Sequence, residues 1–269
     1  MSSNTAGRWL RRFHPSPEAA VRLAILPHAG GSASFYFPFS EALSGAVEVL
    51  AVQYPGRQER SREPGITDLM QLADRITEAL TAEADDRPTA LFGHSMGAML
   101  AFEVASRLQS AGAAVPVLFT SGRRAPSRHR DMESVHTFTD TRLVAELKEL
   151  DGTDSELLDD PNVLSMVLPA IRSDYEAVET YRYQPQPKLF CPVMALVGDS
   201  DPRVDLDEAR AWADHTAHSF ELRVFPGGHF YLSAQRTAVV EAVKQRLAAS
   251  ALLGIAGVTV RTTTRQSTN

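Results

Sequence analysis

Short apolar runs recur along the chain and alternate with stretches in which apolar residues return every three or four positions. Six runs have the length of a strand and show no polar alternation, which is typical of strands covered on both faces in a parallel sheet. They lie at 21–27, 47–55, 89–95, 115–122, 191–201 and 220–228. The stretches between them have the spacing of amphipathic helices. This alternation predicts an α/β fold with a doubly wound, mostly parallel sheet.

Helices can be placed in two of the intervening stretches and after the last run. Thr67 or Asp68 can cap a helix whose apolar residues share one face. The segment 96–111 is expected to be helical and to stop at Gly112, a residue suited to a left-handed helix end. The same spacing predicts a helix over 236–250.

The alternation is interrupted between about residues 126 and 188, where no strand candidate occurs. Two helical patterns lie there instead, around 139–150 and 161–181. Because this segment falls between two strands of the predicted sheet, we interpret it as a helical lid inserted above the carboxyl end of the sheet; an ordinary pair of packing helices is the alternative. We expect one domain over 1–250 and a disordered tail over 251–269, which is polar and has no apolar face.

Composition narrows the class of protein. The 269 residues include 27 Lys and Arg and 33 Asp and Glu, a net charge of −6, so neither a nucleic-acid nor an anionic-membrane surface is expected. No apolar stretch reaches the roughly 18 to 20 residues that span a bilayer, and the N-terminus lacks the apolar core of a secretory signal. The single cysteine, Cys191, forms no internal disulfide, fits a reducing cytoplasm, and is expected to be a small buried apolar residue.

The stretch ALFGHSMGAML, residues 90–100, places Ser95 between two glycines. The pattern G-x-S-x-G alone occurs by chance in roughly one chain in ten of this length. Here it follows a strand pattern and precedes a helical one, which is the context of a nucleophile on a strained turn. The glycines leave room for that turn. Ser95 is therefore predicted to be a nucleophile rather than part of an ordinary tight turn.

A serine nucleophile needs a base, and the base needs an orienting carboxylate. His229 follows two glycines at the end of the last predicted strand, where a loop can deliver its imidazole to the edge of the sheet. Asp199 and Asp201 both follow the preceding strand, and their equal parity does not distinguish them. We favour Asp201, because it lies further into the loop and Pro202 fixes the turn. The other aspartate would then cap the turn.

The remaining histidines are weaker candidates for the base. His28 and His94 lie beside the predicted site but on elements unsuited to that role, and we expect them to be structural. The others lie in polar segments and are expected to be solvated: His14, His129, His136, His215 and His218.

Two backbone amides are candidates for an oxyanion hole. Met96 follows the nucleophile and begins a helix whose first amides favour negative charge. Ala29 lies in the glycine-bearing loop LPHAGGSAS, residues 26–34. That loop lacks the lysine of a phosphate loop and is not G-x-G-x-x-G, although a plain turn or a weak phosphate nest is an alternative. No metal site is expected, because no cluster has ligand spacing.

Taken together, these motifs resemble those of type II thioesterases, the free-standing editing hydrolases of polyketide synthase and nonribosomal peptide synthetase pathways. The resemblance covers most of residues 9–248. It is carried by LPHAGGSASFYFPF, VQYPGRQER, LFGHSMGAMLAFEVASRL, RSDYEAVETYRYQPQPKLFCPVMALVGDSDPRV and FPGGHFYL. The YPGR and RSDY stretches are the most specific, because general α/β-hydrolases do not share them.

The resemblance implies an α/β-hydrolase fold and hydrolysis of aberrant or stalled acyl groups from the phosphopantetheine arm of an acyl or peptidyl carrier protein. Through an acyl-enzyme intermediate, Ser95 would take the acyl group, His229 would act as base and Asp201 would orient it. The amides of Ala29 and Met96 would form the oxyanion hole. No cofactor is implied beyond the phosphopantetheine that the substrate carries, and the enzyme is expected to be a cytoplasmic monomer.

The lid is expected to enclose an apolar chamber in which Met132 and Met166 tolerate varied acyl shapes. Because the chain starts at Met1 and the fold begins soon after, we expect a free-standing enzyme. The stretch GTDSEL, 152–157, superficially resembles a carrier attachment motif, but Glu156 stands where an apolar residue belongs. The alternatives are a general carboxylesterase or lipase-like serine hydrolase on the same fold, and a noncatalytic α/β-hydrolase scaffold.

Overall fold

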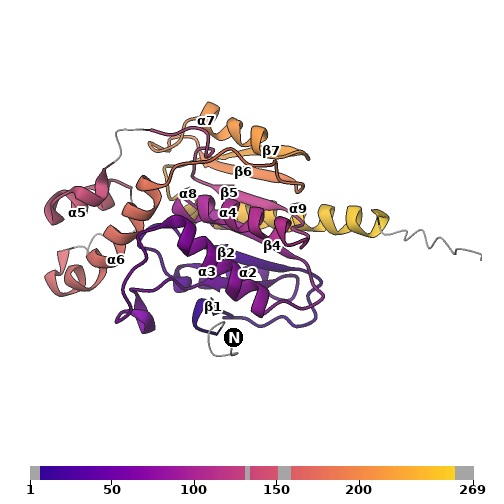
Figure 1. Cartoon of the computed structure of the whole chain (residues 1–269), viewed down its shortest axis with the longest axis horizontal. Coiled ribbons are helices and arrows are strands. Elements are labelled where there is room, and N and C mark those ends of the chain that lie inside the picture. The colour runs from indigo at the N-terminus through magenta and orange to yellow at the C-terminus, as the bar shows by residue number, and fades with distance from the viewer. Residues whose placement is uncertain (1–6, 131–133, 151–158, 258–269) are drawn as a thin grey trace, which may run out of the picture.

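The protein is described from a computed structural model over residues 7–130, 134–150 and 159–257, with side chains to residue 250. Its central element is one sheet of seven strands in the order β1-β3-β2-β4-β5-β6-β7 (Figure 1). The strands are β1 (Leu10–Arg11), β2 (Arg22–Leu26), β3 (Glu48–Val52), β4 (Thr89–His94), β5 (Leu118–Ser121), β6 (Val193–Gly198) and β7 (Phe220–Phe225).

Every neighbouring pair of strands is parallel except β1 with β3. The predicted α/β fold with a mostly parallel sheet is confirmed, and each of the six predicted strands is present. The antiparallel strand β1 was not predicted, because two residues are too few to produce a recognisable pattern.

The helices occupy the stretches between strands. They are η1 (Ala33–Tyr36), α2 (Phe37–Leu43), η2 (Gln58–Arg60), α3 (Leu69–Ala82), α4 (Met96–Ser110), η3 (Val135–Thr137), α5 (Asp140–Leu150), α6 (Pro161–Thr180), α7 (Leu206–Arg210), η5 (Ala211–His215), α8 (Tyr231–Ala234) and α9 (Arg236–Gly257). Within the described ranges, no helix is long and apolar enough to cross a bilayer.

Alternate residues of each central strand contribute to two separate cores. In β2, Ala24 and Leu26 pack with α3 and α4, whereas Leu23 and Ile25 pack with α2 and α9. Because successive strand residues point to opposite faces, the sheet is covered by helices on both sides. This double covering explains why the strand sequences are apolar throughout.

Helix ends follow local sequence signals. Asp68 caps α3 by accepting the Gln71 amide at 3.0 Å, and Gly112 follows α4 with φ +78°. The predicted helix 236–250 instead continues to Gly257, so the tail prediction is wrong for 251–257; Ala and Leu there are strong helix formers. Residues 258–269 lie outside the described part of the chain.

Helices α5 and α6 form the segment inserted between β5 and β6, and they match the predicted helices at 139–150 and 161–181. They lie together at one end of the sheet (Figure 1). Leu143 and Leu147 of α5 form a small core of their own with Leu168 and Ile171 of α6. The inserted helices, hereafter the lid, therefore have a core distinct from the two cores of the sheet.

Candidate active site

Ser95 occupies the sharp turn between β4 and α4. Its φ of 54° and ψ of −117° are unfavourable for a residue with a side chain. The Ser95 amide donates to the Ser121 carbonyl of β5 at 2.8 Å, which fixes the turn to the sheet. A Cβ at Gly97 would lie 2.0 Å from the Leu26 carbonyl oxygen, so only glycine fits between the start of α4 and β2. The surrounding backbone thus holds Ser95 in a strained conformation.

His229 and Asp201 come from the loops after β7 and β6, and their side chains meet. Nδ1 of His229 lies 2.9 Å from Oδ2 and 3.0 Å from Oδ1 of Asp201. Both side chains are buried. An ionised carboxylate only accepts hydrogen bonds, so the contact assigns the proton to Nδ1 and leaves Nε2 able to accept one.

Asp199, the competing aspartate, has a different contact. Its Oδ1 accepts the Gly227 amide at 3.0 Å and thereby joins the loop after β6 to the loop after β7. Asp201 also accepts the Arg203 amide at 2.8 Å, which orders its own turn. Of the two aspartates, Asp201 is the one that contacts His229.

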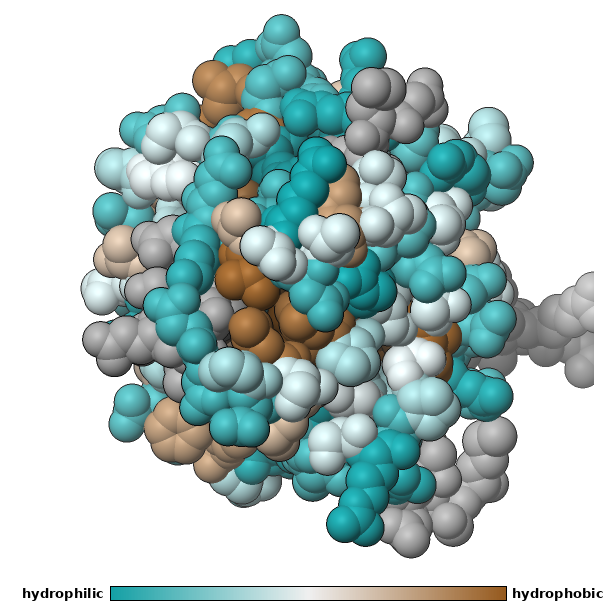
Figure 2. Space-filling model, turned by 90° about the vertical axis from the view of Figure 1, so that its left-hand side faces the viewer, coloured by the Kyte–Doolittle hydropathy of each residue, from teal (hydrophilic) through white to brown (hydrophobic). Residues whose placement is uncertain are grey.

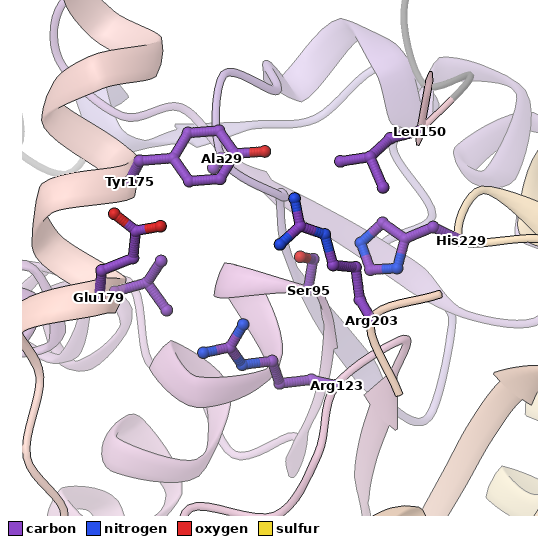
Figure 3. A pocket seen from close by; sticks show the side chains of 9 residues that line it. Ala29, Ser95, Arg123, Leu150, Tyr175, Glu179, Arg203 and His229 are labelled. Carbon is purple, nitrogen blue, oxygen red and sulfur yellow. The ribbon is translucent and has the colours of Figure 1, made fainter. Parts of the chain in front are cut away.

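Ser95 and His229 line one cavity beneath the lid, and Figure 3 shows both side chains facing it. The side-chain hydrogen bonds among the described residues include none between them. In the absence of substrate, a contact between nucleophile and base is often long and tightens only in the substrate complex.

The two residues predicted to donate amides to an oxyanion are Ala29 and Met96. Ala29 lines the same cavity as Ser95. Met96 is the first residue of α4, so its amide has no acceptor within the helix. The positive end of the dipole of α4 adds to the effect.

The cavity lining is more polar than the sequence suggested. The lid contributes Leu150 from α5 and Tyr175 and Glu179 from α6, and the sheet side contributes Arg123 and Arg203 (Figure 3). Leu147 of α5 and Val178 of α6 also line it. The expectation that Met166 lines the acyl chamber is wrong, because 69% of its surface is exposed. Met166 lies off the face of α6 that packs on α5. Met132 lies outside the described residues.

His28 and His94 are buried beside this cavity. His94 Nδ1 lies 2.9 Å from Ser121 Oγ, which in turn lies 2.7 Å from the Tyr231 hydroxyl. Burial lowers the pKa of His94 well below its usual value, and burial with the charges of His229 and Arg57 lowers the pKa of His28 to about 3. Both rings are therefore neutral at pH 7.

The expectation of a solvated His215 is wrong. Its ring is buried against Phe102 and Trp212, and its Nε2 lies 2.9 Å from Ser127 Oγ. A polar local sequence did not reveal this burial, because the apolar partners come from distant elements.

Charged residues of the site were also missed from the sequence. Arg203 forms an ion pair with Glu146 of α5, which links the loop that holds Asp201 to the lid. Glu179 accepts the amides of Val135 and His136 at 2.9 and 3.1 Å. The only local indication that Arg203 belongs to the site was its position directly after Asp201 and Pro202 of the predicted turn. Among the described residues, no group of three or more side chains has a metal-binding arrangement.

Comparison with known proteins adds independent information. A family model described as a thioesterase domain matches residues 21–247. The "probable cadicidin biosynthesis thioesterase" of Streptomyces griseus is 51% identical over 246 residues, 91% of this chain and 68% of that protein. Thioesterase PikA5 of Streptomyces venezuelae is 50% identical over 231 residues, 86% of this chain and 82% of its own length. The solved structure of the type II thioesterase BorB from the borrelidin biosynthetic cluster aligns with a TM-score of 0.85 at 49% identity, covering 92% of this chain and 99% of BorB.

Proposed function

The chain belongs to the thioesterase family, and from this premise we propose that Ser95, His229 and Asp201 release acyl groups held as thioesters on the phosphopantetheine arm of carrier proteins. The chain is a thioester hydrolase with homologues in antibiotic biosynthesis. The observation that carries the assignment of residues is the His229–Asp201 contact at 2.9 Å on the cavity that the strained Ser95 also lines.

In the first half of the reaction, Ser95 Oγ attacks the carbonyl carbon of the thioester and its proton passes to His229 Nε2. The buried carboxylate of Asp201 stabilises the imidazolium that forms. The amides of Ala29 and Met96 donate to the oxyanion of the tetrahedral intermediate. The carbon–sulfur bond then breaks, the leaving thiolate takes the proton of the His229 imidazolium, and the acyl group stays on Ser95.

In the second half, water attacks the acyl-serine ester and gives its proton to His229. The same two amides stabilise the second oxyanion. Collapse of this intermediate breaks the bond to Ser95 Oγ, which recovers a proton from the imidazolium, and the free acid leaves. This scheme uses only side chains and amides of the chain itself, so we propose that a single copy suffices and that no cofactor takes part.

The lid suits a substrate delivered on a slender arm. Apolar residues gather at the centre of the face that carries α5 and α6 and are ringed by hydrophilic ones (Figure 2). We propose that the arm enters at this face while the folded carrier stays outside. The acyl group would then lie against Leu147, Leu150 and Tyr175, which line the cavity beside Ser95.

The test compares the butyryl group on three leaving groups: a phosphopantetheinylated carrier protein, free pantetheine and a simple alcohol. We expect kcat/KM for the carrier thioester to exceed kcat/KM for the oxygen ester by at least about tenfold. This ratio should be larger than the ratio of the free pantetheine thioester to the same oxygen ester. Equal rates on the carrier and on free pantetheine would contradict the carrier-bound substrate. A dominant rate on the oxygen ester would favour a general esterase.

A further inference from the structure

Side chains of the VQYPGRQER stretch hold the loop that contains Ala29. The Tyr54 hydroxyl donates to the Pro27 carbonyl at 3.0 Å, before Ala29 in the chain. The Gln53 side-chain carbonyl accepts the Ala33 amide at 2.8 Å, after it. Both side chains are buried, so the loop is fixed at its two ends from one neighbouring segment.

The middle of the same loop is held by an ion pair. Arg57 and Asp174 form two parallel hydrogen bonds, each 2.8 Å long. Arg57 also donates to the Gly31 carbonyl at 3.0 Å, and Asp174 Oδ2 accepts the Gly30 amide at 2.8 Å. The pair therefore binds the two residues that directly follow Ala29.

The ion pair is almost completely shielded from water. The side chain of Arg57 is 7% exposed and that of Asp174 is 2% exposed. A buried pair of this kind gives geometric specificity rather than large net stability, because desolvation offsets much of the attraction. Its evident effect here is to define where the backbone of Gly30 and Gly31 lies.

Asp174 also connects the loop to the lid, because it belongs to α6. The approach is close at Gly30: its φ is +76°, and a Cβ there would lie 2.6 Å from Ile171 Cγ1 of α6. The loop and α6 are thus joined by a hydrogen bond and direct packing, and Arg57 bridges them through its bonds to Gly31 and Asp174.

We propose that Arg57 and Asp174 are positioning residues of the hydrolysis: together they orient the Ala29 amide toward the oxyanion. The inference rests on the proposed function, in which Ala29 is an oxyanion donor. The Ala29 amide lies in the same peptide plane as the His28 carbonyl, and that carbonyl accepts the Gly31 amide at 2.9 Å. Because Asp174 and Arg57 hold Gly30 and Gly31, they limit rotation of this plane. Lid helix α6 thereby supplies a carboxylate that completes the oxyanion hole without touching substrate.

The variant Asp174→Asn tests this role with little change in volume. The asparagine keeps an oxygen that can accept the Gly30 amide but loses the charge that binds Arg57. We expect kcat for butyryl-carrier hydrolysis to fall about 10- to 100-fold, part of the loss seen when an oxyanion donor is removed. KM should stay within about twofold of its original value, because the pair acts on the transition state.

A second readout separates orientation of the amide from general structural damage. The boron of butylboronic acid bonds to Ser95 Oγ and forms a tetrahedral anion that resembles the intermediate. Its inhibition constant should therefore rise in Asp174→Asn by about the same factor as kcat falls. Arg57→Lys keeps the charge but loses the paired geometry, and it should show a smaller loss in the same two quantities. If Asp174→Asn does not fold, Arg57→Lys carries the test.

Glu103→Gln is the matched control. Glu103 is also a buried carboxylate; it pairs with Arg107 at 2.7 Å and accepts the Tyr181 hydroxyl, just beyond the end of α6, at 2.7 Å. It has no hydrogen bond to the loop at Ala29. Its replacement should lower the melting temperature but leave kcat and boronate inhibition within about twofold.

The proposal is overturned if the Asp174 and Arg57 variants fold and keep both kcat and boronate inhibition. It is also overturned if kcat falls without a change in boronate inhibition, or if Glu103→Gln shows the same losses. Ser95→Ala, measured in the same assays, separates failure of this positioning proposal from failure of the proposed function. Substantial turnover in that variant would refute the proposed function itself, whatever the Asp174 variant does.

Discussion

His229 and Asp201 lie 28 positions apart in the sequence and meet through Nδ1 at 2.9 Å from one carboxylate oxygen and 3.0 Å from the other. The contact is possible because β6 and β7 are adjacent and parallel, so that their following loops emerge at the same edge of the sheet. Since the Asp201 side chain is fully buried, its charge acts on the imidazole with little screening by water.

Replacement of this carboxylate should affect catalysis far more than folding. In Asp201→Asn the amide group can donate to Nδ1, which moves the imidazole proton to Nε2 and removes the base that faces the cavity. We expect kcat to fall about 10³- to 10⁴-fold. Steady-state kinetics with an acyl-carrier thioester, together with a thermal melt, measures both effects.

Asp199→Asn is the control for that experiment. Its side-chain oxygen can still accept the Gly227 amide, so kcat should remain within about twofold. A greater loss of kcat in Asp199→Asn than in Asp201→Asn would show that Asp199, and not Asp201, orients His229.

The turn at Ser95 should tolerate no side chain at Gly97. In Gly97→Ala the new Cβ would meet the carbonyl oxygens of Leu26 and Pro27, which belong to the backbone of the sheet edge and cannot rotate away. We expect the free energy of unfolding to fall by about 1–3 kcal/mol, as for other overpacked sites. Urea denaturation measures the change. Gly7→Ala, where nothing lies within 4 Å of the new Cβ, should lose no stability.

Acyl-chain preference should depend on α5. Leu150 lines the cavity next to Ser95 and His229, so Leu150→Phe reduces the space for a long acyl group. We expect kcat/KM for octanoyl-carrier to fall at least about tenfold, with acetyl-carrier changed less than about twofold. In Met166→Ala, kcat/KM should be unchanged for every acyl chain tested, because Met166 is exposed. A shift in preference in that control, with none in Leu150→Phe, would place the acyl group elsewhere.

Stability should decrease toward acid pH through the buried histidines. Burial lowers the pKa of His28 to about 3 from 6.5, so the unfolded chain binds this proton first as the pH falls. The free energy of unfolding therefore decreases from about pH 6.5 down to about pH 3. Between pH 7.5 and 5 we expect His28 alone to account for about 2 kcal/mol of the loss.

The measurement is urea denaturation of the wild-type chain and His28→Gln at both pH values. The variant should lose less stability than the wild type on acidification, whatever its absolute stability at pH 7.5. His218→Gln replaces an exposed histidine and should follow the wild type. Identical losses in all three proteins would contradict a buried, neutral His28.

The sequence predicted the six long strands, because strands covered on both faces are apolar throughout. It also predicted α5 and α6 closely, since their apolar residues repeat at helical spacing. The position of Ser95 was predictable because a strained turn requires particular neighbours. Periodicity left Asp199 and Asp201 unresolved; the choice between them depends on which carboxylate contacts a loop 28 positions away.

Contacts between distant charged residues could not be predicted. Arg57 and Asp174 lie 117 positions apart. They belong to the YPGR and RSDY stretches that carry the resemblance, but neither stretch indicates that the two side chains meet. The ion pair of Arg203 with Glu146 likewise depends on how the lid lies against the sheet edge. Such pairs leave no periodic pattern, because only the tertiary fold brings their elements together.

The central claim is that the acyl group passes through Ser95. Rapid-quench mixing of the enzyme with butyryl-carrier, followed by acid quenching and mass spectrometry of the digested protein, measures this directly. We expect a transient butyryl mass increment on the peptide that contains Ser95, which appears before the free acid and is absent in Ser95→Ala. Release of the acid at the wild-type rate with no increment on that peptide, or an increment on another residue, would contradict the account.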